Sequence, residues 1–588
     1  MTAPVLPALE ISSLESIGKV VSVDTSRVWI DANDPQAVAR VRVGNLVCIG
    51  TTKTTEFLIG SIERVTRSIR HELLTEEEDD DGGIPTGEVP DDMLRVVLVG
   101  TYRTVDGDRS NVFKRGADSF PPVDKPCYLI EGDNLQRFMG LLSSEIDASE
   151  RLELGHYVAD SSALAIASGD RLFQRHAAIL GSTGSGKSWA VASLLERAQK
   201  LAHPNIIVFD MHGEYTPLTV ASGTEHAYAA GFHIAGPGDL GTPPESALFL
   251  PYWLLNREEM LSMFLDRSDQ NAPNQASRFT AHVKDLKENT LDTQGKHEVK
   301  KTFTVDSPIP YALDELVKRL QDDNTRKGIG ATGKPVKGEW EGRLTRFLSR
   351  LTAKTYDRRY GFLFQPPAAA KGYGWLADQV WQLLRSDDDG PGIKIVDFSE
   401  VPSDVLPVVA GTFARLLYDI QFWMDPDHRT PFCLMCDEAH LYLPAKSDAN
   451  AVQQRALAAF ERIAKEGRKY GVSIVAVSQR PSDVSRTILS QCNNFITLRQ
   501  TNDKDQNVIR SLVPDSLGGL IDILPMLDIG EALVLGDAVL LPSRIKLSAP
   551  TVKPSSATRD FWQEWNTSAP TKSAIEKATE ALRKQTRE

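Results

Sequence analysis

The part of the chain after residue 170 contains short, continuous apolar runs that end in polar residues. Runs of this kind, without alternation of polar and apolar positions, are typical of parallel strands that are buried on both faces. Helical patterns follow several of these runs, and the alternation of strand and helix favours an α/β fold. The pattern therefore predicts an α/β core with a mostly parallel sheet, with strands at 177–180, 205–210, 392–398, 432–436 and 472–477.

The first part of the chain has a different pattern. Short β-rich runs recur between residues 17 and 130, several of them alternate polar and apolar positions, and Gly44, Asn45 and Gly50 mark turns between them. Short strands at regular intervals predict a small barrel or sandwich. The segment lacks the mixture of aromatic and basic residues that a nucleic-acid-binding barrel uses. We expect strands at 19–23, 27–30, 39–43, 46–49, 57–59 and 95–99.

The middle of the chain is helical. Apolar residues recur at helical spacing in 257–265, 309–320 and 342–351, and these helices lie between two core strands. They therefore form a helical insertion in the α/β core. The basic, glycine-rich stretch 324–337 is expected to be an exposed loop, and a loop that contacts DNA is the less favoured alternative.

These patterns divide the chain into five parts. The last part contains Trp562 and Trp565 and then a charged stretch that suits a helix, held either loosely or against a neighbouring subunit. The expected parts are an N-terminal β-barrel (1–135), the first part of the core (136–247), the helical insertion (248–390), the second part of the core (391–550) and a C-terminal tail (551–588).

Composition narrows the class of protein. With 588 residues, 41% apolar and 25% charged, the chain resembles an ordinary globular protein of three or four domains. No apolar run is long enough to cross a membrane, and the N-terminus lacks a secretory signal, so we expect a cytoplasmic protein. Five cysteines, an odd number, do not suggest a disulfide framework. Cys433 and Cys436 are three apart on a strand, face opposite sides, and are expected to be buried without a metal.

The net charge of −13 does not suit a protein that coats nucleic acid. Part of the acidic charge is concentrated at 76–81, which we expect to be a solvated loop. A DNA channel requires only local positive charge. The composition therefore allows a ring whose basic residues line its lumen.

The strongest motif follows the apolar run 177–180. Residues 181–188 fit the pattern G-x-x-x-x-G-K-[ST], and a helical pattern follows. Backbone N–H groups of such a loop surround a phosphate chain at a helix N-terminus. Lys187 is expected to reach the β- and γ-phosphates of ATP, and Ser188 to bind Mg²⁺. The expected nucleotide-binding residues are Gly181, Ser182, Thr183, Gly184, Ser185, Gly186, Lys187, Ser188, Trp189 and Glu214.

Polar residues at the ends of three other strands complete the predicted site. Asp437 and Glu438 follow the strand 432–436, where the first carboxylate suits Mg²⁺ binding and the second suits activation of water. Glu214 lies in the polar stretch after the strand 205–210, and Gln479 follows the strand 472–477. Because the carboxyl ends of parallel strands meet at one edge of a sheet, these residues predict hydrolysis of ATP there.

Five motifs together resemble the HerA family of hexameric DNA-translocating ATPases, which is related to FtsK. They are the loop 181–188, 210–215 (Asp-Met-His-Gly-Glu-Tyr), 436–440 (Cys-Asp-Glu-Ala-His), 466–471 (Glu-Gly-Arg-Lys-Tyr-Gly) and 477–481 (Val-Ser-Gln-Arg-Pro). The closing stretch 527–545 is similar to the C-terminal region of that family, and the resemblance extends from about residue 17 to about residue 547.

The resemblance implies a RecA-like P-loop ATPase core, an N-terminal barrel that helps to assemble the ring, and a homo-oligomer, most often a hexamer, around double-stranded DNA. It implies an arginine supplied by the neighbouring subunit, for which Arg468 matches the family motif. Lys469, Arg462, Arg480 and Arg499 are alternatives, as is a surface arginine paired with Glu466.

The resemblance also implies a partner. Relatives act with the nuclease NurA in DNA end processing, or with a nuclease or a sirtuin-like protein in defence against phage, and the chain is compatible with both. The alternative function is a nucleotide-regulated oligomeric scaffold that activates an effector protein with little DNA translocation.

Overall fold

The computed structural model describes residues 7–25, 27–32, 35–73, 86–220, 227–329, 334–386, 391–447, 449, 451–556, 560–567 and 569–586. The acidic run 76–81 lies outside these residues. The chain forms two compact units. The first unit comprises Met1–Arg197, Ser478–Ser482 and Leu489–Thr551, and the second unit comprises Ala198–Val477, Asp483–Ile488 and Val552–Glu588. Within the described ranges, every helix is too short or too polar to cross a membrane.

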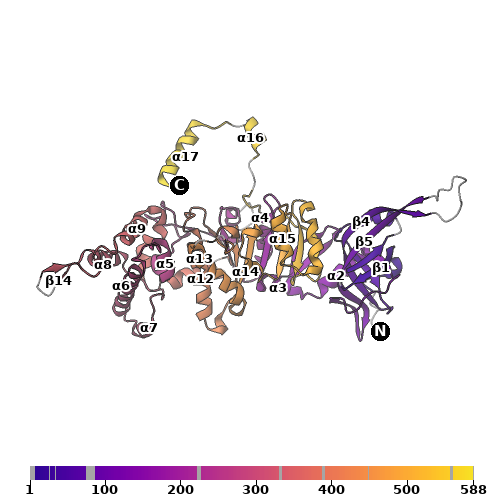
Figure 1. Ribbon diagram of the computed structural model, residues 1–588, viewed down its shortest axis with the longest axis horizontal. Helices are drawn as coiled ribbons and strands as arrows, with labels where there is room; N and C mark the ends of the chain where they lie inside the picture. The colour runs from indigo at the N-terminus through magenta and orange to yellow at the C-terminus, as the bar shows by residue number, and fades with distance from the viewer. Residues whose placement is uncertain are drawn as a thin grey trace. The chain divides into compact units, whose positions relative to one another are not determined.

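The N-terminal part of the first unit is a closed antiparallel barrel (Figure 1). Its strands follow the order β2-β1-β7-β3-β4-β5, and pairing of β2 with β5 closes the ring, while β6 extends the sheet beyond β5. This confirms the barrel that the short alternating runs predict. The strands are β1 (Ser16–Asp24), β2 (Arg27–Asp31), β3 (Leu46–Gly50), β4 (Glu56–Leu73), β5 (Thr86–Asp106), β6 (Arg109–Arg115) and β7 (Pro126–Leu129).

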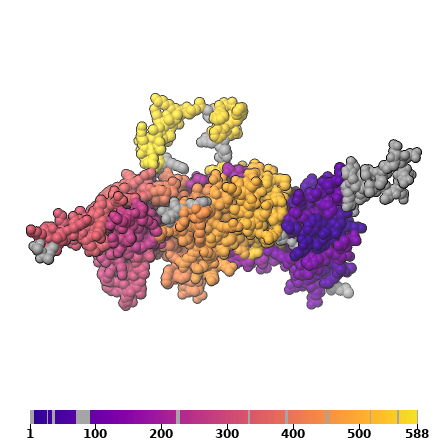
Figure 2. Space-filling view, in the orientation of Figure 1, coloured from indigo at the N-terminus to yellow at the C-terminus, as the bar shows by residue number. Residues whose placement is uncertain are grey.

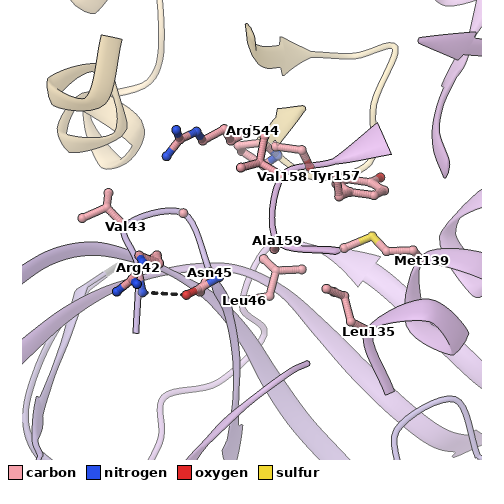
Figure 3. Close-up of a pocket in the computed structure, with 13 residues that line it drawn as sticks. Arg42, Val43, Asn45, Leu46, Leu135, Met139, Tyr157, Val158, Ala159 and Arg544 are labelled. Atoms are coloured by element: carbon pink, nitrogen blue, oxygen red, sulfur yellow. Dashed lines mark hydrogen bonds between the residues drawn. The ribbon is translucent and has the colours of Figure 1, made fainter. Parts of the chain in front are cut away.

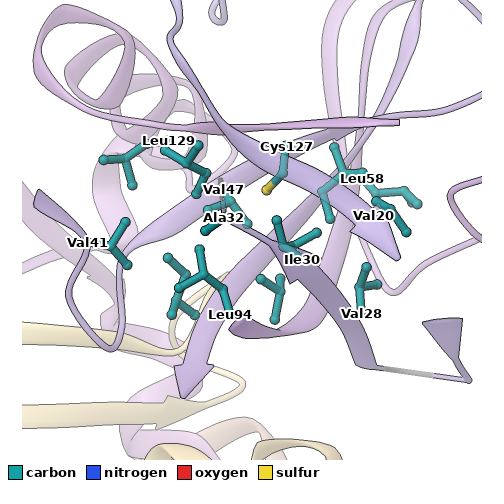
Figure 4. Close-up of a cluster of buried hydrophobic side chains, with 14 of the residues drawn as sticks. Val20, Val28, Ile30, Ala32, Val41, Val47, Leu58, Leu94, Cys127 and Leu129 are labelled. Carbon is teal, nitrogen blue, oxygen red and sulfur yellow. The ribbon is translucent and has the colours of Figure 1, made fainter. Parts of the chain in front are cut away.

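Alternate residues of these strands fill the barrel (Figure 4). Val28 and Ile30 of β2 are fully buried, whereas their neighbours in the strand are partly exposed, as the period of two requires. A second apolar cluster joins the outer face of the barrel to α2 (Gly132–Ser144), where Phe138 stacks edge-on against Tyr102 and Phe113. The barrel thus has one interior core and one covered outer face.

The strand predicted at 39–43 is wrong. Residues 39 and 40 end the helix α1 (Pro35–Arg40), residues 41–43 form no strand, and Val38 and Val41 pack on the interior cluster of the barrel. A spacing of three places these two valines on one helical face, and a proline favours the first position of a helix. The alternation of arginine and valine at 40–43 therefore does not form a strand.

The rest of the first unit carries a mixed sheet in the order β10-β19-β20-β21-β8-β9. Only β10 and β19 are parallel, and the remaining neighbours are antiparallel. The strands are β8 (Arg151–Tyr157), β9 (Asp160–Ser168), β10 (Ala177–Leu180), β19 (Asn494–Leu498), β20 (Glu531–Gly536) and β21 (Ser543–Leu547). The helices are α3 (Gly169–Gln174), α4 (Lys187–Ala198) and α15 (Asp503–Arg510), with the 3₁₀ segment η11 (Asp515–Met526).

The second unit contains a parallel sheet in the order β13-β12-β16-β11-β17-β18. Every residue of β11, β17 and β18 is buried, which confirms the parallel strands that the continuous apolar runs predict. Cys433 and Cys436 are buried in β17, and this burial is as expected. The strands are β11 (Ile206–Asp210), β12 (Ala229–Ile234), β13 (Ala247–Leu248), β16 (Ile393–Asp397), β17 (Phe432–Cys436) and β18 (Val472–Ser478).

Two long helices, α12 (Leu406–Trp423) and α13 (Ala451–Glu466), pack beside this sheet. Phe209 of β11 lies at the centre of an aromatic cluster with ring centroids 5.1 Å from Phe398, 5.5 Å from Phe413 and 6.3 Å from Phe460. These rings fix both helices against β11, whose last residue is Asp210.

The insertion in the second unit is helical. It contains α5 (Arg257–Phe264), α6 (Ala272–Thr293), α7 (His297–Thr302), α8 (Leu313–Thr325), α9 (Thr345–Tyr356), α10 (Gly361–Phe364) and α11 (Trp375–Leu384), and a small hairpin of β14 (Gly328–Ile329) and β15 (Pro335–Val336). Asn256 and Glu259 form a capping box at the start of α5. Arg415 of α12 holds Glu259 through two contacts of 2.8 Å, which ties the insertion to the core.

The tail of the second unit carries two further helices, α16 (Phe561–Thr567) and α17 (Lys572–Lys584). Both Trp562 and Trp565 are exposed. The tail begins beside the core, since the N–H of Ser555 donates to the carbonyl of Glu214 at 2.7 Å.

Candidate functional site

The phosphate loop joins β10 to α4 in the first unit and depends on its glycines. Gly184 and Gly186 have φ values of 72° and 104°, which side chains rarely allow. A Cβ at Gly181 would lie 2.5 Å from the Oγ of Ser185. Ser182 donates from its N–H and its Oγ to the carbonyl of Arg499, at 2.8 and 3.0 Å. The loop therefore has a fixed curvature at the N-terminus of α4.

Lys187 begins α4 and is buried, with its Nζ 3.5 Å from the carbonyl of Ser182. Ser188 is half-buried beside it, and Trp189 is exposed. The Oγ of Ser185 is fully buried and makes no hydrogen bond to any described residue. A buried donor inside a loop of this shape suits a phosphate oxygen as its partner.

Gln479 directly follows β18 and contacts the same loop. Its Oε1 accepts a hydrogen bond from the Oγ1 of Thr183 at 2.6 Å, and its carbonyl accepts one from the Nε2 of Gln500 at 3.5 Å. These two hydrogen bonds hold the side-chain amide of Gln479 against the phosphate loop. This position suits a residue that responds to a bound nucleotide.

At the end of β11 in the second unit, Asp210 shapes the turn that carries Glu214. Its fully buried carboxylate accepts backbone N–H groups of four residues at 2.8–3.2 Å, namely His212, Gly213, Glu214 and Tyr215. Burial raises the pKa of Asp210. The residue thus organises the turn, a role that its position at a strand end does not reveal.

Asp437 follows β17 and is buried, with its N–H on the carbonyl of Phe209 at 3.2 Å. Burial, and then the carboxylates of Glu438 and Glu214, raise the pKa of Asp437 well above its ordinary value. Asp437, Glu438 and Glu214, which come from two strand ends, therefore interact electrostatically. Their mutual repulsion favours a nearby cation.

Glu438 has a left-handed backbone, with φ 43° and ψ 46°, although glutamate seldom adopts it. The side chain is 13% exposed, and the Nδ1 of His440 lies 3.2 Å from its Oε2. His440 belongs to the 3₁₀ turn η8 (Ala439–Leu441) that directly follows. Non-glycine residues with this conformation cluster at functional sites, where the fold holds them in place.

This conformation predicts a stability difference between two variants of Glu438. Glu438→Asn and Glu438→Gln both remove the charge, but asparagine tolerates the left-handed region far better than glutamine. We expect the asparagine variant to unfold with a free energy about 1 kcal/mol higher than the glutamine variant. Denaturant midpoints of the two proteins check this, and an equal or lower midpoint for Glu438→Asn would exclude strain at this residue.

The donors that the sequence assigns to Mg²⁺ suit a hard cation. Ser188 offers a half-buried hydroxyl oxygen, and Asp437 offers a carboxylate among other carboxylates. In the described ranges no three His, Cys, Asp or Glu side chains are grouped so that they could hold a metal by themselves. Mg²⁺ usually keeps several waters and binds one or two protein oxygens together with substrate phosphates. These donors therefore fit a Mg²⁺ ion that arrives with a nucleotide.

A protein-family model and two curated relatives are similar to this chain. Residues 152–417 match the model of the helicase HerA central domain. A probable helicase of Methanocaldococcus jannaschii is 26% identical over 449 residues, which cover 75% of this chain and 74% of that protein. The DNA double-strand break repair helicase HerA of Sulfolobus acidocaldarius is 26% identical over 395 residues, 66% of this chain and 68% of that protein. Residues 152–417 of the chain therefore correspond to the central domain of HerA helicases.

The matched central domain contains Lys187 and Glu214, whereas Glu438, Arg468 and Gln479 follow its last residue. Among solved structures, VirB4 of Thermoanaerobacter pseudethanolicus is similar at 17% identity and a TM-score of 0.45, over 69% of this chain and 98% of that one.

Arg468 lies in the 3₁₀ turn η9 (Gly467–Tyr470), directly after α13. Its side chain is exposed and forms no ion pair with any described residue. Glu466, the alternative partner, instead lies 3.9 Å from Arg462 and 3.5 Å from the Oη of Tyr418. The guanidinium of Arg468 is therefore available to another molecule, as a residue supplied to a neighbouring subunit must be.

A cavity of about 270 Å³ in the first unit does not involve these residues (Figure 3). Leu46, Leu135 and Met139 line it, with Arg42 and Arg544 near its edge. The guanidinium of Arg544 binds Glu531 at 2.6 Å, and that of Arg42 donates to the carbonyl of Ala39 at 3.1 Å. Both charges are already used within the protein, so we assign no ligand to this cavity.

Proposed function

We propose that this chain is an ATP-driven motor of the HerA family that moves along double-stranded DNA as a ring of identical subunits. The observation that carries the proposal is the pair of acidic residues after β17. Asp437 is buried, and Glu438 is held in a left-handed conformation, in a chain that also has a glycine-shaped phosphate loop. Backbone strain of this kind clusters at functional sites, and it suits a carboxylate that must be aimed at a reacting water.

Each residue has a distinct task in the proposed reaction. Lys187 neutralises charge on the β- and γ-phosphates, and the N–H groups of the loop bind the same oxygens. Ser188 and Asp437 would hold a Mg²⁺ ion, which would offset charge on the phosphates. Glu438 accepts a proton from the attacking water, so that the water oxygen forms the new bond to γ-phosphorus as the bond to the β–γ bridging oxygen breaks.

Gln479 and Glu214 support this chemistry. The hydrogen bond between Thr183 and Gln479 ties the amide to the loop, so loss or gain of the γ-phosphate changes the surroundings of Gln479. Glu214 lies on the turn that Asp210 organises, and its negative charge acts on Asp437, so it would assist Asp437 in attracting Mg²⁺. Both therefore act on the orientation of groups and not as nucleophiles.

The names of the relatives support DNA as the partner, since they include a DNA double-strand break repair helicase. Displacement of streptavidin from the end of a biotinylated duplex tests translocation directly. We expect displacement that requires ATP and that fails in Lys187→Ala. Hydrolysis without displacement on any duplex would instead favour a nucleotide-regulated scaffold.

A ring predicts complementation between two inactive variants. Lys187→Ala and Arg468→Ala subunits should each be inactive alone, yet an equal mixture should place a wild-type Lys187 opposite a wild-type Arg468 at about one quarter of the subunit boundaries. We expect turnover to return to that fraction of wild type when subunits exchange. Lys465→Ala, which removes an exposed lysine of α13, serves as the control, and no recovery at any mixing ratio would show that Arg468 does not act across the boundary.

We further propose that the motor works beside a separate effector protein, either a NurA-like nuclease or a sirtuin-like defence protein. Hexameric assembly and this partnership rest on the family resemblance. Capture of the tagged chain from its native host, followed by identification of the bound protein, decides between the two partners.

A further inference from the structure

A small hairpin extends from the helical insertion of the second unit (Figure 1 and Figure 2). Its strands β14 and β15 are antiparallel, with Gly328 opposite Val336 and Ile329 opposite Pro335. The hairpin separates α8 from α9, and the side chain of Ile329 is 85% exposed. No apolar core of its own accounts for its presence, because all four of its strand residues are exposed or half-buried.

Basic side chains flank both strands. Arg326 and Lys327 precede β14, and Lys334 and Lys337 lie at either end of β15. All four are exposed, and none forms an ion pair with an acidic group of the described residues. The segment 326–346 contains six basic and two acidic residues in a chain whose net charge is −13. The hairpin is therefore a local concentration of positive charge that the rest of the protein does not neutralise.

The register places two of these charges against each other. Continuing the observed pairs by one residue sets Lys327 opposite Lys337. The strands stay close there, since a Cβ at Gly338 would lie 1.9 Å from the carbonyl oxygen of Arg326. Like charges directly opposite each other destabilise a hairpin. A short two-stranded hairpin is already marginal in water, so an anion beside these two lysines would stabilise the pairing.

The face that carries Lys327 and Lys337 also carries Ile329, because residues two apart share a face and opposite residues share it too. The Cβ atoms of opposite residues such as Lys327 and Lys337 lie about 5 Å apart, and Ile329 is the next residue on the same face. Two positive charges beside an apolar side chain suit a phosphate backbone that borders a groove. Lysine binds phosphate as a point charge and needs no further geometry.

We propose that the hairpin formed by β14, β15 and their flanking residues Arg326, Lys327, Lys334 and Lys337 binds the phosphate backbone of duplex DNA. This inference rests on the proposed function. An acidic protein is the other class of polyanion, but a protein interface requires a buried apolar centre, and among the described residues of the two strands Ile329, Pro335 and Val336 are the exposed apolar side chains. Phosphate contacts require only unpaired positive charges, which the hairpin has.

A matched pair of double variants tests the inference. Lys327→Gln/Lys337→Gln removes the two opposed charges of the hairpin, and Lys284→Gln/Lys318→Gln removes two exposed lysines from α6 and α8 of the same insertion. Binding of a fluorescent 40-base-pair duplex is measured by anisotropy at several salt concentrations, together with ATP turnover without DNA. We expect the hairpin variant to bind about ten-fold more weakly, with a salt dependence shallower by roughly 1–2 in log K against log salt.

In the same test, turnover without DNA should match wild type in both double variants, because neither pair belongs to the nucleotide site. Equal DNA affinity and equal salt dependence of the two double variants would overturn the inference while leaving the motor intact. Failure of the wild type to bind duplex DNA would instead refute the proposed function. Unchanged DNA binding together with weaker binding of poly-glutamate by the hairpin variant would assign the hairpin to an acidic protein and also overturn the inference.

Discussion

Glu438→Gln is expected to hydrolyse ATP at least about 100-fold more slowly than the wild type while it still binds the nucleotide. Glutamine keeps the size and the strained backbone of Glu438 but cannot accept a proton from water. Loss of a positioned general base typically costs about two to four orders of magnitude. Phosphate release under saturating ATP measures the loss, and a fluorescent ATP analogue measures the binding.

Glu145→Gln provides the control for this variant, because Glu145 is an exposed glutamate at the end of α2. We expect its turnover to equal that of the wild type. Turnover of Glu438→Gln within about three-fold of wild type would show that another group activates the water, since so small a change is far below the loss expected for a general base.

Lys187→Ala is expected to lose both nucleotide affinity and turnover, with a fall of about 100-fold or more in kcat/KM. The ammonium group contacts the phosphates in the ground state and more strongly as charge develops on them, so its removal affects both terms. Lys200→Ala is the control, because Lys200 is an exposed lysine shortly after α4. An unchanged KM together with an unchanged kcat would mean that the phosphates bind elsewhere.

Together the two variants separate two roles. Glu438→Gln should trap bound ATP, whereas Lys187→Ala should bind it poorly. A chain in which both variants bind ATP like wild type and hydrolyse it like wild type could not use the site described here.

The sequence predicts the parallel strands well, because a strand that is buried on both faces is a continuous apolar run, which can be recognised without its neighbours. β11, β17 and β18 are apolar throughout and end in the polar residues that form the candidate site. The phosphate loop is equally local, since its glycines and Lys187 depend only on the turn between β10 and α4.

Features that depend on distant partners escape this kind of prediction. The antiparallel strands β8, β9, β20 and β21 come from opposite ends of the core, and only their pairing shows that they share a sheet. Asp210 could have been a metal ligand by position, but its four backbone contacts show that it shapes a turn. The left-handed backbone of Glu438 is likewise invisible in a glutamate, which favours other conformations.

The basic stretch 324–337 shows the same limit in reverse. Its glycine and lysine content indicates an exposed loop, but exposure alone does not indicate what its basic side chains bind. The pairing of β14 with β15 places Lys327 opposite Lys337, and this arrangement gives the charges a direction and a common face. The pairing of the two strands therefore supports DNA binding by this stretch, which its composition alone does not.

The central claim, that ATP hydrolysis by this chain is coupled to duplex DNA, is tested most directly by phosphate release from the wild-type protein with and without a long duplex, over a range of salt concentrations. We expect the duplex to raise turnover several-fold at low salt, and the stimulation to fall steeply as salt rises, because phosphate contacts release counterions. Turnover without DNA should change little over the same range. Turnover that is indifferent to the duplex at every salt concentration would contradict the motor.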